Sequence, residues 1–329
     1  MKTNRVILCA VFVLSCLAVG AYAEGLVSPG TTELNDSGTS SNPAEWYLDD
    51  DYVIGDTFYV GRSTASVLNR NWNQFSISDG YDFTANAGLV IGEGYQIRNG
   101  NSDYNSITVN EDSVLTSVGN LIIGGPNGQR NYLTVLAGAE VNVAGNIKLG
   151  GGSTSYYGRY NHVDISGSGA RLSITGSLDA NNGYNGTENT VNVSDDGVMF
   201  IDSNKDGTGI LDLYYHSSYG RCYLELDGGL VALWGDETGT FAPGQTIRKC
   251  IKLWDEESSS WKIVADLPSG STLALGVDYV VDAAKAAELG LDDEFIGFTV
   301  LQSVPEPASV MFLVTGSVAL CGRKIRRKR

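Results

Sequence analysis

The sequence predicts an all-β protein, a right-handed parallel β-solenoid (β-helix) of about six rungs. Two observations carry this prediction: an internal repeat, and a strand period of two within each repeat. Five repeats open with Asn followed by alternating apolar positions, and they recur roughly every 30 residues. They begin at Asn73, Asn105, Asn131, Asn161 and Asn189, and a sixth copy begins one further period on, at Cys222. Self-similarity at this period indicates stacked units rather than one wrapped core.

Each repeat contains three short strands separated by turn residues. In the third repeat the strands are 133–136, 141–143 and 147–149. Three strands in a repeat of this length fit one rung of a parallel solenoid, in which each strand pairs with its counterpart one rung on. The Asn residues are expected to stack as an amide ladder, and the 41 glycines suit corners that need positive φ. A β-propeller blade usually needs four strands, and an antiparallel sandwich does not explain the gapless match of neighbouring repeats.

The N-terminus predicts export. Lys2 and Arg5 precede an apolar segment, and Ala21 and Ala23 form a small-residue site at which signal peptidase would leave Glu24 first. Residues 1–23 are therefore a predicted signal peptide. A second-ranked alternative is a lipoprotein-like cleavage at Cys16, where the bulky Leu14 fits poorly.

The remaining chain divides by composition. Residues 24–52 are rich in Ser, Thr, Gly and Asp and predict a flexible lead, and the solenoid is expected over 53–235, with 53–67 as a capping pre-rung. The repeat dissolves after Trp234, so 236–303 is predicted to be a C-terminal cap, with 283–289 as its one short helix. Caps are expected because the ends of a solenoid expose unpaired strand edges.

The C-terminus, residues 304–329, has three parts in a fixed order. A Pro-Glu-Pro motif is followed by an uncharged segment, 308–322, and a basic cluster. The motif is Val304, Pro305, Glu306 and Pro307, and the cluster is Arg323, Lys324, Arg326, Arg327, Lys328 and Arg329. The segment is predicted to be a single, marginal transmembrane segment, because it is uncharged but shorter than the ~20 apolar residues that span a bilayer comfortably. The cluster favours a cytoplasmic C-terminus.

This tail closely resembles the PEP-CTERM sorting signal of exported bacterial proteins, and the repeats resemble autotransporter-like β-helices. The resemblance of the tail implies recognition at Val304–Pro307 by a membrane protease-transferase, an exosortase, and removal of the segment and cluster beyond. It implies transient residence in the inner membrane of a Gram-negative-type bacterium, then location at the cell surface or in an exopolysaccharide matrix. The alternative is an ordinary tail anchor.

Removing both predicted signals leaves 14 basic and 37 acidic residues, a formal charge of −23. Such a surface repels nucleic acid and anionic lipid and keeps an exported protein soluble. Nucleic acid is therefore excluded as an expected partner.

Two local patterns suggest a disulfide and a calcium-binding loop. Cys222 and Cys250 are the two cysteines outside the signals, and in an exported chain they either form a disulfide or remain free thiols. Asp202, Asn204, Asp206 and Thr208 follow the start of a calcium loop, but position twelve is Leu213 rather than a bidentate Glu. An ordinary turn is the favoured interpretation, and no cofactor is expected apart from this speculative calcium.

Catalytic patterns are weak. The two histidines are His162 and His216, and His162 occupies an outward position that varies between repeats, so a surface role is favoured. Tyrosines near the loops between rungs suggest a platform for sugar rings, with a purely structural wall as the equal alternative. They are Tyr156, Tyr157, Tyr160, Tyr184, Tyr214, Tyr215, Tyr219 and Tyr223.

The sequence therefore predicts an exported, non-catalytic β-solenoid that is sorted to the cell surface or the matrix and associates with exopolysaccharide. Two alternatives stay open: a secreted β-helix polysaccharide lyase or hydrolase, and a surface adhesin. Fold analogy alone is a poor warrant for enzymatic activity.

Overall fold

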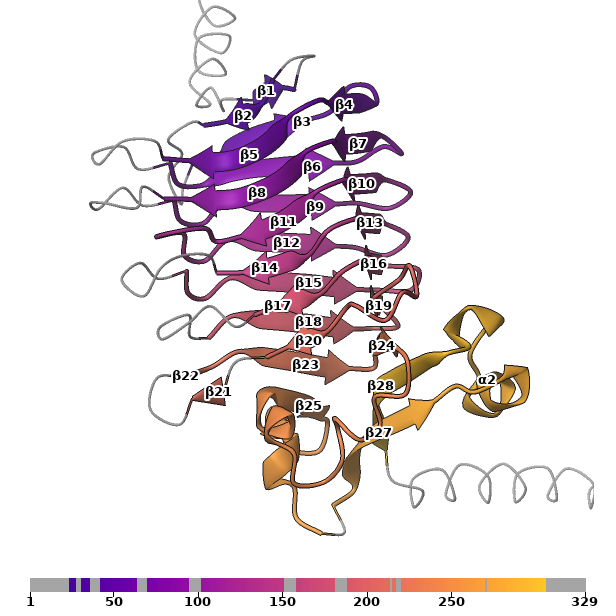
Figure 1. Ribbon diagram of the computed structural model, residues 1–329. Coiled ribbons are helices and arrows are strands. Elements are labelled where there is room, and N and C mark those ends of the chain that lie inside the picture. The colour runs from indigo at the N-terminus through magenta and orange to yellow at the C-terminus, as the bar shows by residue number, and fades with distance from the viewer. Residues whose placement is uncertain are drawn as a thin grey trace, which may run out of the picture.

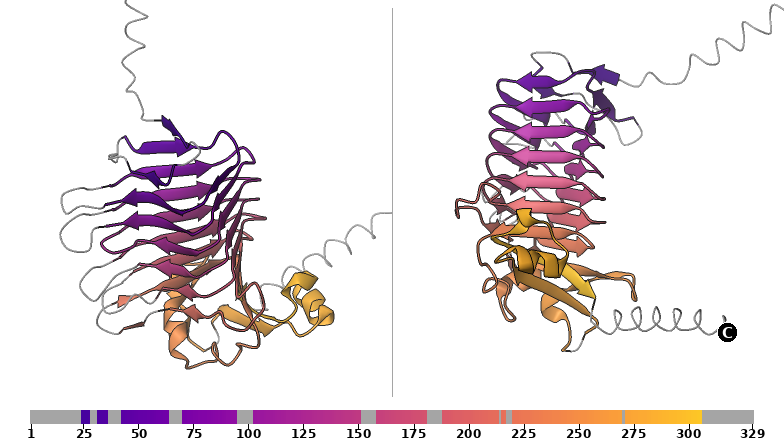
Figure 2. Two further views of the ribbon diagram at one scale, coloured as in Figure 1. Left: turned by 45° about the horizontal axis from the view of Figure 1, so that its top comes forward. Right: turned by 90° about the vertical axis from the view of Figure 1, so that its right-hand side faces the viewer.

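The computed structural model describes residues 24–27, 31–35, 42–63, 70–94, 102–150, 158–180, 188–213, 215–216, 220–269 and 271–305. They form a parallel β-solenoid with three sheets as its walls, and Figure 1 shows the rungs stacked from the N-terminal to the C-terminal end. Side and tilted views show equivalent strands of successive rungs in columns (Figure 2). The predicted fold class is confirmed.

The ten-stranded sheet runs along the whole stack. Its strands, in spatial order, are β1 (Glu24–Leu26), β3 (Ala44–Tyr47), β6 (Asn73–Ile77), β9 (Ser106–Val109), β12 (Tyr132–Val135), β15 (His162–Ser166), β18 (Thr190–Ser194), β23 (Tyr223–Asp227), β25 (Ile251–Asp255) and β26 (Ser260–Ile263). Every pair is parallel except β25 with β26, which turn back on each other as a hairpin.

The other two sheets complete the rungs. The nine-stranded sheet contains β27 (Leu273–Tyr279), β28 (Phe298–Pro305), β24 (Leu230–Trp234), β19 (Val198–Ile201), β16 (Arg171–Ile174), β13 (Glu140–Val143), β10 (Val114–Ser117), β7 (Asp82–Ala85) and β4 (Tyr52–Ile54). The seven-stranded sheet contains β2 (Glu33–Leu34), β5 (Thr57–Arg62), β8 (Gly88–Glu93), β11 (Asn120–Ile123), β14 (Ile147–Leu149), β17 (Leu178–Asp179) and β20 (Leu211–Asp212). A short hairpin, β21 (Tyr215–His216) and β22 (Gly220–Arg221), precedes β23.

The strands from β3 to β20 form six consecutive triplets, one strand in each sheet, which agrees with the prediction of about six rungs. The set of rungs differs from the predicted one: five begin at the predicted Asn residues and one begins at Ala44, whereas the predicted copy at Cys222 contributes β23 and β24 but no described strand of the seven-stranded sheet. The first rung starts earlier than the sequence predicts. β3 lies in the expected flexible lead and pairs with β6, with Ala44 opposite Asn73. The second and third strands of this rung, β4 and β5, lie at the predicted capping pre-rung. Its first strand was missed because Ala replaces the heading Asn and because Trp46 and Tyr47 follow in place of the usual alternation.

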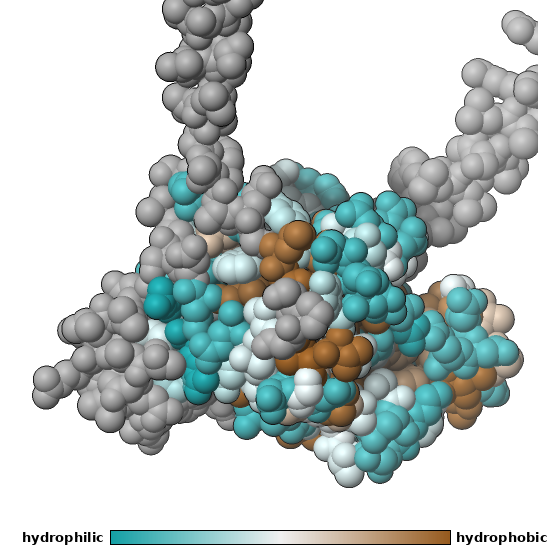
Figure 3. Space-filling view, turned by 90° about the horizontal axis from the view of Figure 1, so that it is seen from above, coloured by the Kyte–Doolittle hydropathy of each residue, from teal (hydrophilic) through white to brown (hydrophobic). Residues whose placement is uncertain are grey.

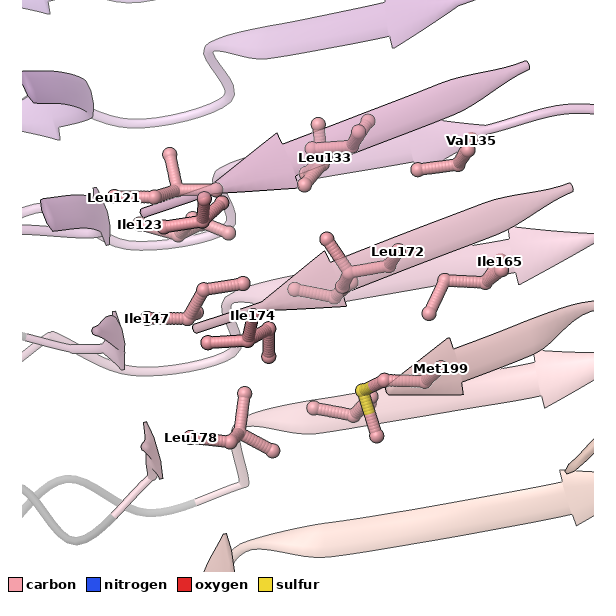
Figure 4. Packing of buried hydrophobic residues seen from close by; sticks show 14 of the residues in the cluster. Leu121, Ile123, Leu133, Val135, Ile147, Ile165, Leu172, Ile174, Leu178 and Met199 are labelled. Atoms are coloured by element: carbon pink, nitrogen blue, oxygen red, sulfur yellow. The ribbon is translucent and has the colours of Figure 1, made fainter. Parts of the chain in front are cut away.

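The core is a continuous column of side chains from equivalent positions. Leu133 and Val135 of β12 pair with Ile107 and Val109 of β9 on one side and with Val163 and Ile165 of β15 on the other, all with 0% exposure. Figure 4 shows Leu, Ile and Val side chains stacked in layers between the sheets. Because each layer covers the next, the apolar burial that drives folding is shared between neighbouring rungs.

The predicted Asn ladder is present and buried. Its members stand at the N-terminal ends of five successive strands of the ten-stranded sheet, β6, β9, β12, β15 and β18. The five Asn residues Asn73, Asn105, Asn131, Asn161 and Asn189 are fully buried. The backbone N–H of each of the first four donates to Oδ1 of the next Asn, at 2.9–3.0 Å. Their side-chain amides donate to the same oxygens at 2.8–3.2 Å. The ladder thus satisfies polar groups that would otherwise be buried without partners.

The C-terminal end is closed by the predicted cap. β28 pairs antiparallel with β24, and β27 pairs antiparallel with β28. The predicted helix is confirmed as α2 (Ala283–Leu289), which is capped by the Asp282 side chain and by Gly290 in the left-handed conformation. Three short 3-10 helices, η2 (Thr246–Cys250), η3 (Val264–Asp266) and η4 (Asp293–Phe295), complete the cap. A second apolar cluster packs it on the outer side of β19 and β24, with Phe200, Ala232, Val280, Ala286, Phe295, Phe298 and Val300 as members.

The N-terminal end is more open. Leu26 and Val53 are 61% and 70% exposed there. A view onto this end shows hydrophobic residues among hydrophilic ones (Figure 3).

Candidate functional site

The residue before each ladder Asn has left-handed backbone geometry. This column contains Trp72, Tyr104, Arg130, Tyr160 and Glu188, with φ between 54° and 67°. Left-handed geometry costs a side-chain-bearing residue roughly 1 kcal/mol or more, and glycine would adopt it freely. Four successive rungs nevertheless carry an aromatic ring or a guanidinium there, so this corner is the first candidate site.

The side chains of the column stack on one another along the solenoid axis. The rings of Trp72 and Tyr104 are parallel, with centroids 4.1 Å apart and planes 4° apart. The guanidinium of Arg130 lies 5.4 Å from the Tyr104 ring centre and 5.0 Å from that of Tyr160. Contacts between cations and aromatic faces stabilise this continuous stack.

A polar column flanks the stack one residue earlier. The backbone N–H of Asp103 donates to Oδ1 of Asn71 at 2.8 Å, and the N–H of Gln129 donates to Oδ1 of Asp103 at 2.9 Å. Burial raises the pKa of the Asp103 carboxyl, against the N–H of Gln129 and the charge of Arg130, which lower it. These bonds hold the corner backbone in register from rung to rung.

Arginine is concentrated at the same corner. Arg159 precedes Tyr160, and its carbonyl accepts the backbone N–H of Arg130 at 3.0 Å. The carbonyl of Arg70 accepts from Ser102 Oγ at 3.2 Å, and that of Arg221 accepts from the N–H of Glu188 at 2.9 Å. We give the name corner stripe to the aromatic and arginine side chains at this corner of the rungs headed by Asn73, Asn105, Asn131 and Asn161. They are Arg70, Trp72, Tyr104, Arg130, Arg159 and Tyr160, and all are partly exposed.

Sequence reasoning found only Tyr160 of this stripe. Trp72, Tyr104 and Arg130 were missed because they stand at the corner itself, apart from the tyrosines near the loops. Aligning the repeats on their Asn residues shows a bulky residue immediately before each of the first four, and that signal was available. Tyr223 lies on β23 instead, and Tyr215 lies on β21 beneath Arg221 and Lys249. The remaining loop tyrosines, Tyr156, Tyr157, Tyr184, Tyr214 and Tyr219, lie outside the described residues.

The outer face of the ten-stranded sheet holds a second group of polar residues. His162 stacks on Tyr132 with centroids 5.1 Å apart and planes 6° apart. Burial lowers the pKa of His162, and nearby Asp164 opposes the shift. Burial also raises the pKa of Asp164, while His162 and a hydrogen bond from Asn192 lower it. His162 therefore packs on the wall as a half-buried ring beside a desolvated carboxyl.

Glu225, which lies two strands away from Asp164, forms an ion pair. The register places Asp164 opposite Asn192, and Asn192 opposite Glu225. Glu225 forms an ion pair with Lys252 at 2.7 Å, and the Lys252 ammonium also lies 3.5 Å from the centre of the Tyr223 ring. An ion-paired carboxylate is poorly suited to act as a general acid, because its partner stabilises the charged form.

The predicted calcium loop uses its side chains within itself. Asp202 is fully buried and accepts the backbone N–H groups of Asp206 at 3.3 Å and Gly207 at 2.8 Å. Asp206 accepts from Asn204 Nδ2 at 2.8 Å and from the Thr208 N–H at 2.8 Å. Within the described part of the chain, no three His, Cys, Asp or Glu side chains gather as metal ligands. The turn interpretation accounts for these residues, and calcium remains only a prediction.

The cysteines are buried and are not joined by a disulfide. Cys222 Sγ donates to the Ala180 carbonyl at 2.9 Å, and Cys250 Sγ lies 3.9 Å from the Leu213 carbonyl oxygen. Burial raises the pKa of Cys250 to about 11. Both thiols therefore serve as small apolar groups of the core.

The predicted sorting motif starts inside the cap. Val304 is opposite Ala274, and Pro305 is opposite Leu273, at the end of β28. Glu306, Pro307, the basic cluster and the predicted signal peptide up to Ala21 and Ala23 lie outside the described residues, whereas Glu24 begins β1. No helix within the described ranges is both long and apolar enough to cross a bilayer.

The fold defines the class of this chain, a parallel β-solenoid with a buried Asn ladder and a stack of aromatic and arginine side chains at one corner. No protein-family description, curated protein or solved structure matches the chain.

Proposed function

We propose that this chain is an exported, non-catalytic β-solenoid that serves at the bacterial cell surface or in the extracellular polysaccharide matrix. The main support is the six-rung stack, which is closed at its C-terminal end by a cap. The last strand of the cap, β28, runs directly into the Pro-Glu-Pro motif. A rigid rod of this kind presents a long surface from a single attachment point. The predicted signal peptide and the exosortase-type tail support the destination.

The surface chemistry supports a matrix role. The outward positions of β6, β9 and β12 carry small polar side chains such as Ser76, Thr108 and Thr134. Hydroxyl and amide groups of this kind suit contact with hydrated glycans, and the net charge of −23 between the predicted cleavage points keeps the rod soluble.

Fractionation of the native host tests this proposal. We expect the protein in the outer-surface and matrix fractions, released from the latter when the exopolysaccharide is digested. A matched strain whose chain ends at residue 303 should retain the protein in the periplasm or release it freely into the medium. Recovery of the full chain from the cytoplasm would contradict the proposal.

One observation favours a second candidate, a glycan-cleaving enzyme. The desolvated Asp164 has a raised pKa beside His162, and a protonated carboxyl is what glycoside hydrolysis requires of its general acid. Incubation with acidic and neutral polysaccharides distinguishes the two. New reducing ends or unsaturated products that disappear in Asp164→Asn would establish the enzyme. The absence of any product would support the non-catalytic role.

A further inference from the structure

We propose that the corner stripe binds an acidic polysaccharide, which lies along the solenoid axis across successive rungs. This inference deepens the matrix association proposed above and rests on it. It assigns the ligand a class, a glycan carrying carboxylate or sulfate groups, and it assigns the contact to the corner rather than to a sheet face.

The first support for binding of an acidic polysaccharide is the distribution of charge. Between residues 24 and 303 the chain has eight arginines among 14 basic and 37 acidic residues. Four of the eight, Arg70, Arg130, Arg159 and Arg221, lie at this one corner, where Asp103 and Glu188 are the acidic residues of the two columns. An anionic polymer is repelled by most of this protein and finds its complementary charge at the corner.

The second support is the hydrogen-bonding chemistry of the side chains in the corner stripe. Guanidinium groups bind carboxylates and sulfates through paired N–H donors. The phenol groups of Tyr104 and Tyr160 and the indole of Trp72 add neutral donors for sugar hydroxyls. Each rung contributes one group of the stack, at the ~4.8 Å strand spacing, so the donors form a periodic row that suits a periodic polymer.

The third support is the rigidity of the corner, which holds the donors in place before a ligand binds. The left-handed backbone of Trp72, Tyr104, Arg130 and Tyr160 is held by the ladder Asn residues beside it and by the stacking contacts above. Backbone strain of this kind persists where the surroundings over-determine it, and it clusters at functional sites. A pre-organised row of donors also loses little side-chain entropy when a ligand binds.

The geometry favours a glycan over single-stranded nucleic acid. Nucleic-acid grooves offer open aromatic faces on which bases stack. Here the faces of Trp72 and Tyr104 cover each other at 4.1 Å, and the Tyr104 and Tyr160 faces that meet Arg130 are occupied by its guanidinium. The edges of the stack remain for hydrogen bonds to hydroxyl and carboxylate groups.

The test measures binding of the purified full chain to four immobilised probes: polygalacturonate, dextran sulfate, unmodified dextran and oligo(dT). We expect binding to polygalacturonate or dextran sulfate that weakens as salt rises, and at least tenfold weaker binding to dextran and oligo(dT). The two anionic probes show whether carboxylate or sulfate is preferred. Equal binding to dextran, or tighter binding to oligo(dT), would overturn the assignment.

Variants locate the contact. Arg130→Gln with Arg159→Gln should weaken binding to the preferred anionic probe about tenfold or more, since hydrogen bonds to charged groups are stronger than those between neutral groups. Lys148→Gln, which removes an exposed charge from the outer face of β14, is the matched control and should stay within twofold of wild type. Arg159→Gln alone serves if the loss of Arg130 disturbs folding, as judged by circular dichroism.

Equal losses in the stripe variants and in Lys148→Gln would show general electrostatics and overturn the site. The proposed function fails separately. If the native protein is found in the matrix but the stripe variants bind as wild type, matrix association stands and the corner is wrong. If the protein never reaches the surface, the proposed function falls whatever the stripe binds.

Discussion

Gly124 lies directly against the side chain of Asn161, which heads the second rung after its own. A Cβ atom at Gly124, whose φ is +71°, would lie 2.1 Å from Asn161 Nδ2 and 2.3 Å from its Cγ. The same relationship joins Gly61 to Asn105 and Gly92 to Asn131. At Asn105, Asn131 and Asn161 the buried amide ladder therefore needs a glycine at the end of β5, β8 and β11, both for its backbone angle and for the missing side chain.

Gly124→Ala should lower the free energy of unfolding by at least about 2 kcal/mol, because left-handed strain and overpacking add. Gly80→Ala is the matched control. Its φ is +77°, but the nearest atom to an added Cβ is the Asp112 carbonyl oxygen at 3.9 Å, so it should cost only about 1 kcal/mol. Urea unfolding of both variants measures the difference. Equal costs would mean that the Asn161 side chain yields readily and that the glycine is not required for packing.

Asn131→Ala should destabilise the fold by about 1–3 kcal/mol, the cost of leaving buried polar groups unpaired. Asn131 Oδ1 accepts from the backbone N–H and Nδ2 of Asn105, and its own Nδ2 donates to Asn161 and to the Ser102 carbonyl. Asn142→Ala, on the outer face of the same rung, is the control. It should change the urea midpoint little, and a comparable drop there would argue against the ladder as a stabilising element.

Asp164→Asn should raise the melting temperature more at pH 7 than at pH 4. Burial raises the pKa of Asp164 in the folded state, so the folded chain holds this proton at pH values where the unfolded chain, with a pKa near 3.9, has lost it. Its contribution to stability is therefore greatest below the unfolded pKa and is lost as pH rises through the folded one.

Asn at position 164 escapes this loss and still accepts a hydrogen bond from Asn192. Asp82→Asn, which removes a charge from an exposed position on β7, controls for the net charge of the protein. If both variants gain equally at pH 7, the effect is general repulsion and not the burial of Asp164.

Native Cys222 and Cys250 should react slowly with iodoacetamide at pH 8. Both are fully buried, and a pKa of about 11 keeps the Cys250 thiol protonated. Peptide mapping should find both modified quickly once the chain is unfolded in guanidinium. Recovery of a disulfide-linked pair of peptides containing Cys222 and Cys250 from unreduced native protein would show that the exported chain closes this bridge after all.

The repeat made most of this fold predictable. Asn131 and the apolar residues after it repeat with enough fidelity to predict the strands of the Asn-headed rungs and the amide ladder. The first strand of the rung at Ala44 was missed because its ladder position lacks Asn. The antiparallel β27–β28 pairing could not be predicted, because it depends on tertiary contact with β24 rather than on a local pattern.

The candidate site was less predictable. Side chains such as Trp72 and Arg130 lie two repeats apart in the sequence, and only the rung register places them in one stack. Their left-handed backbone is also invisible to composition, since glycine would be the expected residue. The arginines at the corner, by contrast, could have been noticed by aligning the repeats and reading the residues before each Asn.

The most direct test of the proposed export and sorting is the intact mass of the native protein, measured separately in membrane, outer-surface and medium fractions. We expect surface or medium forms that begin at Glu24 and end within or just after Val304–Pro307. A chain that keeps its basic cluster and is confined to the membrane would contradict it, because the tail would then be a simple anchor.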